Sequence, residues 1–97
     1  MKLSHSQNYI KNKDIVEKLM DFVDFGSTEI VLEVGPGKGI ITDRLVETRK
    51  KIIAVEADLV NFELLKKKYS TYNNIDLVAG DFLEYKLPES PFIIVSN

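Results

Sequence analysis

A glycine-rich turn follows the first strongly apolar run of this 97-residue chain. Gly35, Gly37 and Gly39 are separated by single residues and come directly after residues 30–34. Glycine adopts positive φ angles without strain and lets a ligand approach the main chain closely. A helix that begins right after such a turn directs its free N–H groups toward that ligand. The pattern therefore predicts a buried strand that leads into a ligand-binding turn.

A carboxylate ends the next apolar run. Glu56 closes residues 52–56, and an acid at the end of a second strand can accept hydrogen bonds from both hydroxyls of a ribose. This role is shared by folds that bind NAD and folds that bind S-adenosyl-L-methionine. The spacing Gly35-x-Gly37-x-Gly39 differs from the dinucleotide fingerprint G-x-G-x-x-G only in its last interval. The turn and Glu56 predict a nucleotide-like ligand without separating these two cofactors.

Two further acids favour S-adenosyl-L-methionine. Glu33 lies two residues before the first glycine, where negative charge is unfavourable beside a pyrophosphate but acceptable beside an ammonium and a sulfonium. Asp81 follows the third apolar run and can accept a hydrogen bond from the exocyclic amine of adenine, while Phe82 offers a backbone N–H or a ring face. Asp81 can also cap a short helix, and the two roles are compatible.

The elements that must position these residues alternate between helix and strand. Apolar residues at helical spacing predict the helices, and Asp14 with Glu17 has the form of a capping box. Near-continuous apolar runs predict strands that are covered on both faces. We expect helices over residues 14–25, from 40 and from 59, strands over 30–34, 52–56, 75–79 and 92–95, and a short helical turn near 82–85.

This alternation implies right-handed crossovers and an open parallel α/β sheet. Ligands of such sheets bind beyond the carboxyl ends of the strands. The glycine turn, Glu56, Asp81 and Asn97 each follow or end a predicted strand, so we expect them to gather at one edge of the sheet.

Composition excludes several kinds of chemistry. The chain has no cysteine and one histidine, so we expect neither a thiolate nucleophile nor a metal site. A net charge of −2 is not that of a self-sufficient nucleic-acid binder, so an RNA substrate would need a further surface. No apolar run approaches the ~20 residues that cross a bilayer, and the N-terminus lacks the apolar segment of a signal peptide. We expect a cytoplasmic protein without membrane contact.

Five short motifs follow one another along the chain: residues 5–10 (His-Ser-Gln-Asn-Tyr-Ile), residues 33–39, Glu56, residues 80–83 (Gly-Asp-Phe-Leu) and Asn97. Together they resemble the motifs of the ribosomal RNA adenine N6-dimethyltransferases. The His5-Ser6 beginning is most similar to the Erm group, which modifies large-subunit ribosomal RNA and confers macrolide–lincosamide–streptogramin resistance. The housekeeping small-subunit enzymes usually carry Leu-Gly-Gln-Asn-Phe there. The resemblance implies a Rossmann-like S-adenosylmethionine-dependent methyltransferase fold, with strand order 3-2-1-4 and ribosomal RNA as the partner.

The resemblance also implies a role for individual residues. Asn97 matches the first residue of the family's catalytic Asn-Ile/Leu-Pro-Tyr/Phe motif. Its side-chain oxygen and a backbone carbonyl would accept both N6–H bonds of adenine and hold the nitrogen in line with the methyl group. The implied cofactor contacts are Gln7, Asn8 and Ile10 from an N-terminal arm over residues 1–12, Gly35 and Gly37 at the methionine part, Glu56 at the ribose, and Asp81 and Phe82 at the adenine.

The family's sheet normally continues for three further strands and is followed by a basic helical RNA-binding domain. Residues 13–97 thus correspond to the N-terminal part of the cofactor-binding domain, and we expect this chain alone not to methylate RNA. We expect a monomer, with association through an exposed sheet edge as the alternative. Two other functions stay open at this point: a NAD-type cofactor domain and a non-catalytic interaction module with a degenerate site.

Overall fold

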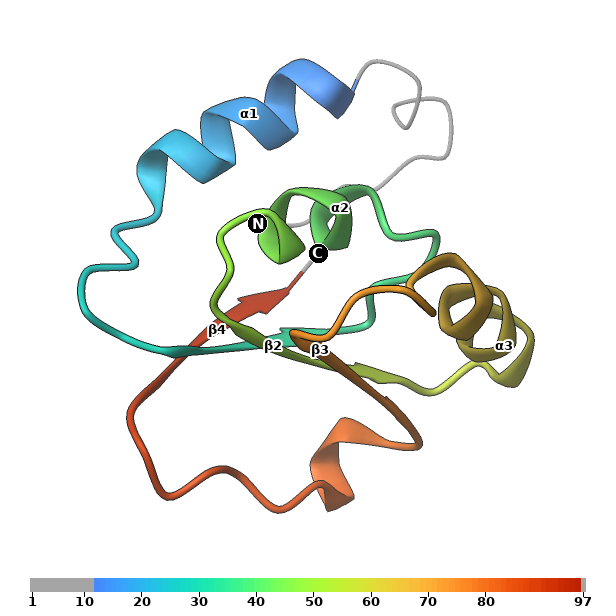
Figure 1. Cartoon of the computed structure of the whole chain (residues 1–97). Coiled ribbons are helices and arrows are strands. Elements are labelled where there is room, and N and C mark those ends of the chain that lie inside the picture. Colours follow the sequence, from blue (N-terminus) through green and yellow to red (C-terminus); the bar gives the residue numbers. More distant parts are fainter. Residues whose placement is uncertain (1–11, 97) are drawn as a thin grey trace.

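The computed structural model describes residues 12–96, which form a four-stranded parallel sheet with helices (Figure 1). The strands lie in the order β3-β2-β1-β4, and every neighbouring pair is parallel. This confirms the predicted open α/β sheet and its order. The elements are α1 (Asn12–Phe22), β1 (Ile30–Val34), α2 (Ile40–Val46), β2 (Lys51–Glu56), α3 (Leu59–Lys68), β3 (Ile75–Ala79), the 3-10 helix η2 (Phe82–Glu84) and β4 (Phe92–Ser96).

The three α-helices cover one face of the sheet. Val16 of α1, Leu45 of α2 and Leu65 of α3 join Val31 and Ile52 of the central strands in one buried cluster. Each of these side chains is at most 2% exposed. The amphipathic faces of the helices and the alternating inward positions of the strands therefore meet in a single core, which fixes the carboxyl ends of the strands relative to α2 and α3.

The opposite face of the sheet is covered by an irregular segment. Leu32, Ile53 and Val55 point to this side, where they pack against side chains that include Phe82 and Tyr85. The segment that carries these two rings, with η2 at its start, runs beneath the sheet in Figure 1 (orange). Since consecutive strand residues alternate between faces, Leu32 on this side leaves Glu33 on the helical side.

The predicted element bounds were accurate for strands and less so for the first helix. β1 and β3 have the predicted bounds, and β2 and β4 are each one residue longer. The capping box was wrong, because α1 begins at Asn12 and Asp14 lies inside its first turn. Glu17 instead accepts a hydrogen bond from Arg44 of α2, with Nη2 3.0 Å from Oε1. Glu17 thus contacts another helix in place of the local capping bond that the sequence predicted.

Within residues 12–96, no helix has the length and apolar character that crossing a membrane requires.

Candidate functional site

The glycine turn between β1 and α2 has a backbone that favours glycine. The φ angles are +68° at Gly35, +61° at Gly37 and +89° at Gly39. An added Cβ would meet nothing within 4 Å at Gly35 and only the Gly35 carbonyl oxygen, 3.9 Å away, at Gly37. At Gly39 the same atom would lie 2.5 Å from the Tyr69 hydroxyl oxygen. The first two glycines therefore border open space, and the third is packed against α3.

Glu56 joins the end of β2 to this turn. Its side chain is 6% exposed, and its two oxygens accept hydrogen bonds from the backbone N–H groups of Gly37, at 2.8 Å, and Asp58, at 2.9 Å. A carboxylate offers about four lone-pair positions, so each oxygen keeps a further one. The carboxylate is thus held in one orientation with capacity for two more donors. That is the number of donors presented by the vicinal hydroxyls of a ribose.

Glu33 lies within β1, and its side chain faces α2. It is 2% exposed, and Oε1 accepts a hydrogen bond from the Thr42 hydroxyl at 2.5 Å. Burial raises the pKa of Glu33 to about 7, the Thr42 bond opposes this rise, and the nearby charges of Glu56 and Asp43 add to it. Near neutral pH the group is therefore partly protonated. Glu33 therefore carries only part of the negative charge that its position before the glycines had predicted, and it favours a cationic ligand less strongly than expected.

Asp81 and Phe82 follow β3 at the start of η2. Asp81 Oδ1 accepts a hydrogen bond from the Leu83 N–H at 2.9 Å, so the capping role expected as one possibility is confirmed. The ring of Phe82 packs under the sheet against the Leu32 cluster. A hollow of about 370 Å³ lies beside Asp81, and its lining includes the side chains of Val55 and Val78.

The predicted clustering at the carboxyl ends of the strands is confirmed for the described residues. Glu56 is the meeting point, because its side chain binds the Gly37 N–H and its carbonyl oxygen accepts a hydrogen bond from the Gly80 N–H at 3.0 Å. The turn after β1, the end of β2 and the segment after β3 are thereby linked. The remaining predicted site residues, Gln7, Asn8, Ile10 and Asn97, lie outside the described residues.

Comparison with known proteins identifies the family. The sequence model for the ribosomal RNA adenine dimethylase family matches residues 1–97. The chain belongs to this family. A probable ribosomal RNA small subunit methyltransferase A from Pyrococcus abyssi is 34% identical over 82 residues, which are 84% of this chain and 30% of that protein. An rRNA methyltransferase from Streptomyces thermotolerans is 36% identical over 93 residues, which are 96% of this chain and 31% of that protein.

Solved structures agree with the family assignment. The 23S rRNA methyltransferase ErmE has a TM-score of 0.75 and 28% identity over 86% of this chain and 34% of its own. A dimethyladenosine transferase from Plasmodium falciparum has a TM-score of 0.72 and 28% identity over 87% of this chain and 31% of its own. The fold is that of the Rossmann-like S-adenosylmethionine-dependent methyltransferases. The chain spans about a third of the length of these dimethylase relatives.

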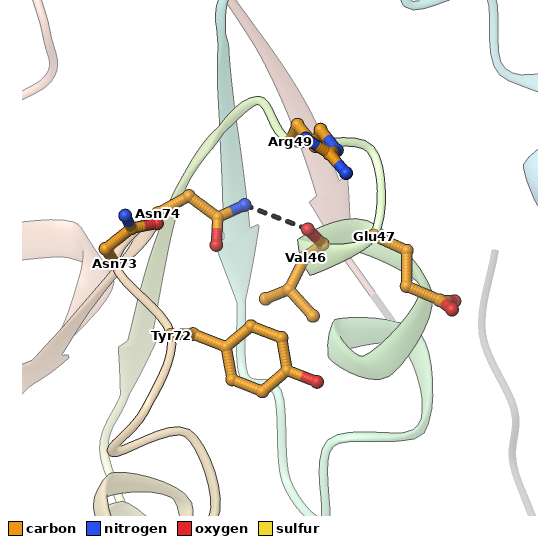
Figure 2. Close-up of a pocket in the computed structure, with 6 residues that line it drawn as sticks. All are labelled: Val46, Glu47, Arg49, Tyr72, Asn73 and Asn74. Carbon is orange, nitrogen blue, oxygen red and sulfur yellow. Dashed lines mark hydrogen bonds between the residues drawn. The ribbon is translucent and has the colours of Figure 1, made fainter.

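A second hollow lies at the opposite end of the dimethylase sheet. It measures about 520 Å³ and lies where β2 and β3 begin. Figure 2 shows Asn74 pointing toward α2, where its Nδ2 donates to the Val46 carbonyl oxygen at 2.9 Å. The same nitrogen is 3.0 Å from the Lys50 carbonyl oxygen. No predicted site residue lines this hollow, which is therefore separate from the site at the glycine turn.

Sequence reasoning missed the side chains that support the site from behind. Thr42 was not singled out, because a threonine within an apolar helical face gives no signal of a partner. Tyr69 was not singled out as a site residue either. In the structure its hydroxyl contacts Gly39 and Asp43. The signal available in the sequence was the type of residue, since a tyrosine at a buried position needs a hydrogen-bond partner where a phenylalanine does not.

Proposed function

We propose that this chain is the cofactor-binding part of an S-adenosylmethionine-dependent ribosomal RNA adenine N6-methyltransferase. The observation that carries the proposal is the Glu56 carboxylate, which is buried, bound to the Gly37 and Asp58 N–H groups and still able to accept two donors. The family match and the position of this carboxylate at the turn after β1 both support it.

The described residues fit the cofactor in three respects. Open space beside Gly35 and Gly37 admits close approach to the main chain. Glu56 has the acceptor capacity that a ribose needs. The exposed Asp81 borders the hollow at the ends of β2 and β3, where its carboxylate would accept a hydrogen bond from the adenine amine. When bound, the cofactor supplies an electrophilic methyl group, and these residues hold and orient it.

The other site assignments are part of the same proposal. Gln7, Asn8 and Ile10 would cover the cofactor from the arm over residues 1–12, and Glu33 would support the turn from within. Asn97 would orient the adenine amine by accepting its N–H bonds, because that amine is a poor nucleophile until its nitrogen is held in line with the methyl group. Residues 13–97 would form the first part of a longer catalytic domain that works on ribosomal RNA in the cytoplasm.

The RNA substrate is the finer part of the proposal. We infer large-subunit ribosomal RNA, with macrolide resistance as the outcome, from the resemblance of the His5-Ser6 motif to the Erm group. The names of several relatives favour small-subunit RNA instead. Expression, in a macrolide-sensitive bacterium, of the whole reading frame that contains this chain, followed by mass spectrometry of both ribosomal RNAs, separates the two. N6-methyladenine only in the small-subunit RNA would overturn the large-subunit assignment.

Cofactor binding is tested by titrating the 97-residue chain with S-adenosylhomocysteine while recording amide NMR spectra. We expect saturable shifts at Gly35, Gly37, Glu56 and Asp81. A parallel titration with NAD is the control for a dinucleotide-binding domain. An unchanged spectrum with S-adenosylhomocysteine, or displacement of it by NAD at lower concentration, would refute the proposal.

A further inference from the structure

The hydroxyl of Tyr69, directly after α3, reaches the glycine turn. The side chain is 3% exposed, and its oxygen lies 2.6 Å from Asp43 Oδ1 and 3.1 Å from the Gly39 carbonyl oxygen. A hydroxyl has one proton to donate, and the shorter distance and the charge of the carboxylate make Asp43 its main acceptor. Burial, followed by the bond to Asp43, raises the pKa of Tyr69, so the hydroxyl keeps its proton at neutral pH.

The neighbouring Lys68 makes a parallel pair of contacts. Its Nζ donates to Asp43 Oδ2 at 3.2 Å and to the Lys38 carbonyl oxygen at 3.3 Å. Two successive residues of one segment therefore contact the carbonyl groups of two successive residues of the turn. The ion pair between Lys68 and Asp43 is half-exposed and contributes little by itself. The buried hydroxyl of Tyr69 is the stronger connection.

These contacts fix the turn because the peptide group is planar. Holding the carbonyl groups of Lys38 and Gly39 fixes the direction of the N–H groups in the same peptide planes. The Gly39 N–H donates to the Pro36 carbonyl oxygen at 2.9 Å, which closes the turn around Gly37. Gly37 in turn donates to Glu56. The peptide planes of the turn thus connect the Lys38 carbonyl group, held by Lys68, to the carboxylate at the proposed cofactor site. Tyr69 is joined to the same turn through Asp43, whose backbone N–H donates to the Gly39 carbonyl oxygen at 2.8 Å.

Packing alone does not account for a tyrosine here. The ring lies in the buried core cluster and is edge-on to the ring of Tyr72, with 5.7 Å between centroids, and a phenylalanine ring would fill the same space. A buried hydroxyl is costly unless it is hydrogen-bonded. The hydrogen-bond partners of this hydroxyl belong to the glycine turn and to the start of α2. Its role is therefore expected at the proposed cofactor site.

We propose that Tyr69, acting with Asp43, is a positioning residue that holds the glycine turn in the conformation that binds the cofactor. This inference rests on the proposed function, because it takes the turn to be the cofactor site. It assigns no contact between Tyr69 and the cofactor itself.

The experiment compares Tyr69→Phe with Tyr72→Phe in the 97-residue chain. The two rings are neighbours, but Tyr72 is 46% exposed, so Tyr72→Phe is a matched control for loss of a hydroxyl. Two quantities are measured under conditions where each variant is folded: hydrogen exchange of the Gly37 and Gly39 amides without ligand, and the dissociation constant for S-adenosylhomocysteine.

For Tyr69→Phe we expect faster exchange at both glycine amides and about tenfold weaker binding, the loss expected for a charge-assisted hydrogen bond. We expect wild-type values for Tyr72→Phe. A merely structural role for Tyr69 would raise exchange throughout the core and leave the glycines no more affected than Leu65. That result, or unchanged exchange and affinity in Tyr69→Phe, would overturn the inference. If the wild-type chain does not bind S-adenosylhomocysteine, the proposed function fails instead, while the exchange data still decide whether Tyr69 holds the turn.

Discussion

The carboxylate of Glu56 closes the glycine turn through the Gly37 N–H and, in the proposed function, also accepts hydrogen bonds from the cofactor. In Glu56→Gln, one oxygen becomes an NH₂ group that faces a backbone N–H donor, so the amide of Gly37 or Asp58 loses its acceptor. Because a broken bond to a charged group costs about 1.5–3 kcal/mol, we expect at least about tenfold weaker binding of S-adenosylhomocysteine by calorimetry and a lower melting temperature. Glu63→Gln, at an exposed acid of α3, is the control. Equal affinity in Glu56→Gln and the wild type would contradict this role.

The buried Glu33 carboxyl predicts a specific pH dependence of stability. Its pKa is about 7 in the folded chain against an ordinary value of 4.5, so the folded state binds more protons than the unfolded state between these values. The stabilising contribution is therefore complete below pH 4.5 and is lost as the pH rises through about 7, and over this window the free energy of unfolding falls by about 3 kcal/mol.

Urea unfolding measured between pH 5 and 8 checks this sign. Glu33→Gln removes the titrating group, and we expect its free energy of unfolding to vary much less over the same window. Thr42→Val removes the donor that stabilises the ionised form, so the loss of stability should continue to higher pH than in the wild type. A wild-type stability that increases from pH 5 to 7 would show that Glu33 is ionised throughout.

For single residues, the sequence predicted where the acids of the proposed site lie better than it predicted their protonation. Glu33 and Glu56 could be selected from their distance to the glycines and from the ends of apolar runs. The protonation of Glu33 could not, because it depends on burial beneath α2 and on Thr42. In the sequence, a carboxylate near the end of a strand looks the same whether it is solvated and charged or buried and protonated. The packing of the neighbouring helix determines which of the two holds.

The third glycine of the turn after β1 is packed against the end of α3, and the first is not. This difference predicts unequal costs for alanine at the two positions. Gly35→Ala and Gly39→Ala both place a side chain at positive φ, which costs about 1–2 kcal/mol for a residue other than glycine. Gly39→Ala also brings a Cβ to 2.5 Å from the Tyr69 hydroxyl oxygen, whereas Gly35 borders open space. We expect Gly39→Ala to lose more stability than Gly35→Ala in thermal unfolding.

A double mutant separates the clash from the backbone strain. Removal of the hydroxyl in Tyr69→Phe should recover part of the stability lost in Gly39→Ala and none of that lost in Gly35→Ala. Purely additive effects in the Gly39→Ala, Tyr69→Phe pair would mean that the turn moves away from α3 without resistance.

Strand positions were predictable and the ends of the first helix were not, for a physical reason. Residues 30–34 and 75–79 are apolar runs bounded by turn residues, so the strands they form have only one place to begin and end. The start of α1 was predicted from Asp14 and Glu17 as a local capping pair. Glu17 instead pairs with Arg44 on another helix, a contact between segments that no local pattern contains.

The family resemblance supplied the strand order, and the open parallel sheet followed from connection rules applied to the whole chain. These rules do not predict which segments cover the two faces of the sheet. The segment after β3, which carries Phe82 and Tyr85, packs beneath Leu32 and Ile53. The apolar residues of an irregular segment have no period, so their packing partners cannot be predicted from spacing.

The two edges of the sheet differ in a way that predicts how whole molecules associate. β3 carries Asp76, whose carboxylate is 3.0 Å from Lys51 Nζ, and a charge on an edge strand discourages pairing with a second chain. β4 pairs with β1 and, in the sheet formed by residues 12–96, has no strand on its other side. Its sequence Phe-Ile-Ile-Val-Ser has no charge, and Ile94 is 50% exposed.

This uncharged edge favours association, the alternative to the monomer expected from the sequence. We therefore expect the 97-residue chain to associate through β4 as its concentration rises, which light scattering would record as an increasing average mass. Ile94→Lys places a charge on this edge and should shift association to higher concentration. Leu59→Lys is the matched control, because Leu59 is 67% exposed on α3. An equal effect of both substitutions would indicate general loss of apolar surface, and a monomeric wild type at high concentration would show that β4 is protected in solution. Association that only Ile94→Lys suppresses is the outcome that the unpaired, uncharged edge of β4 predicts.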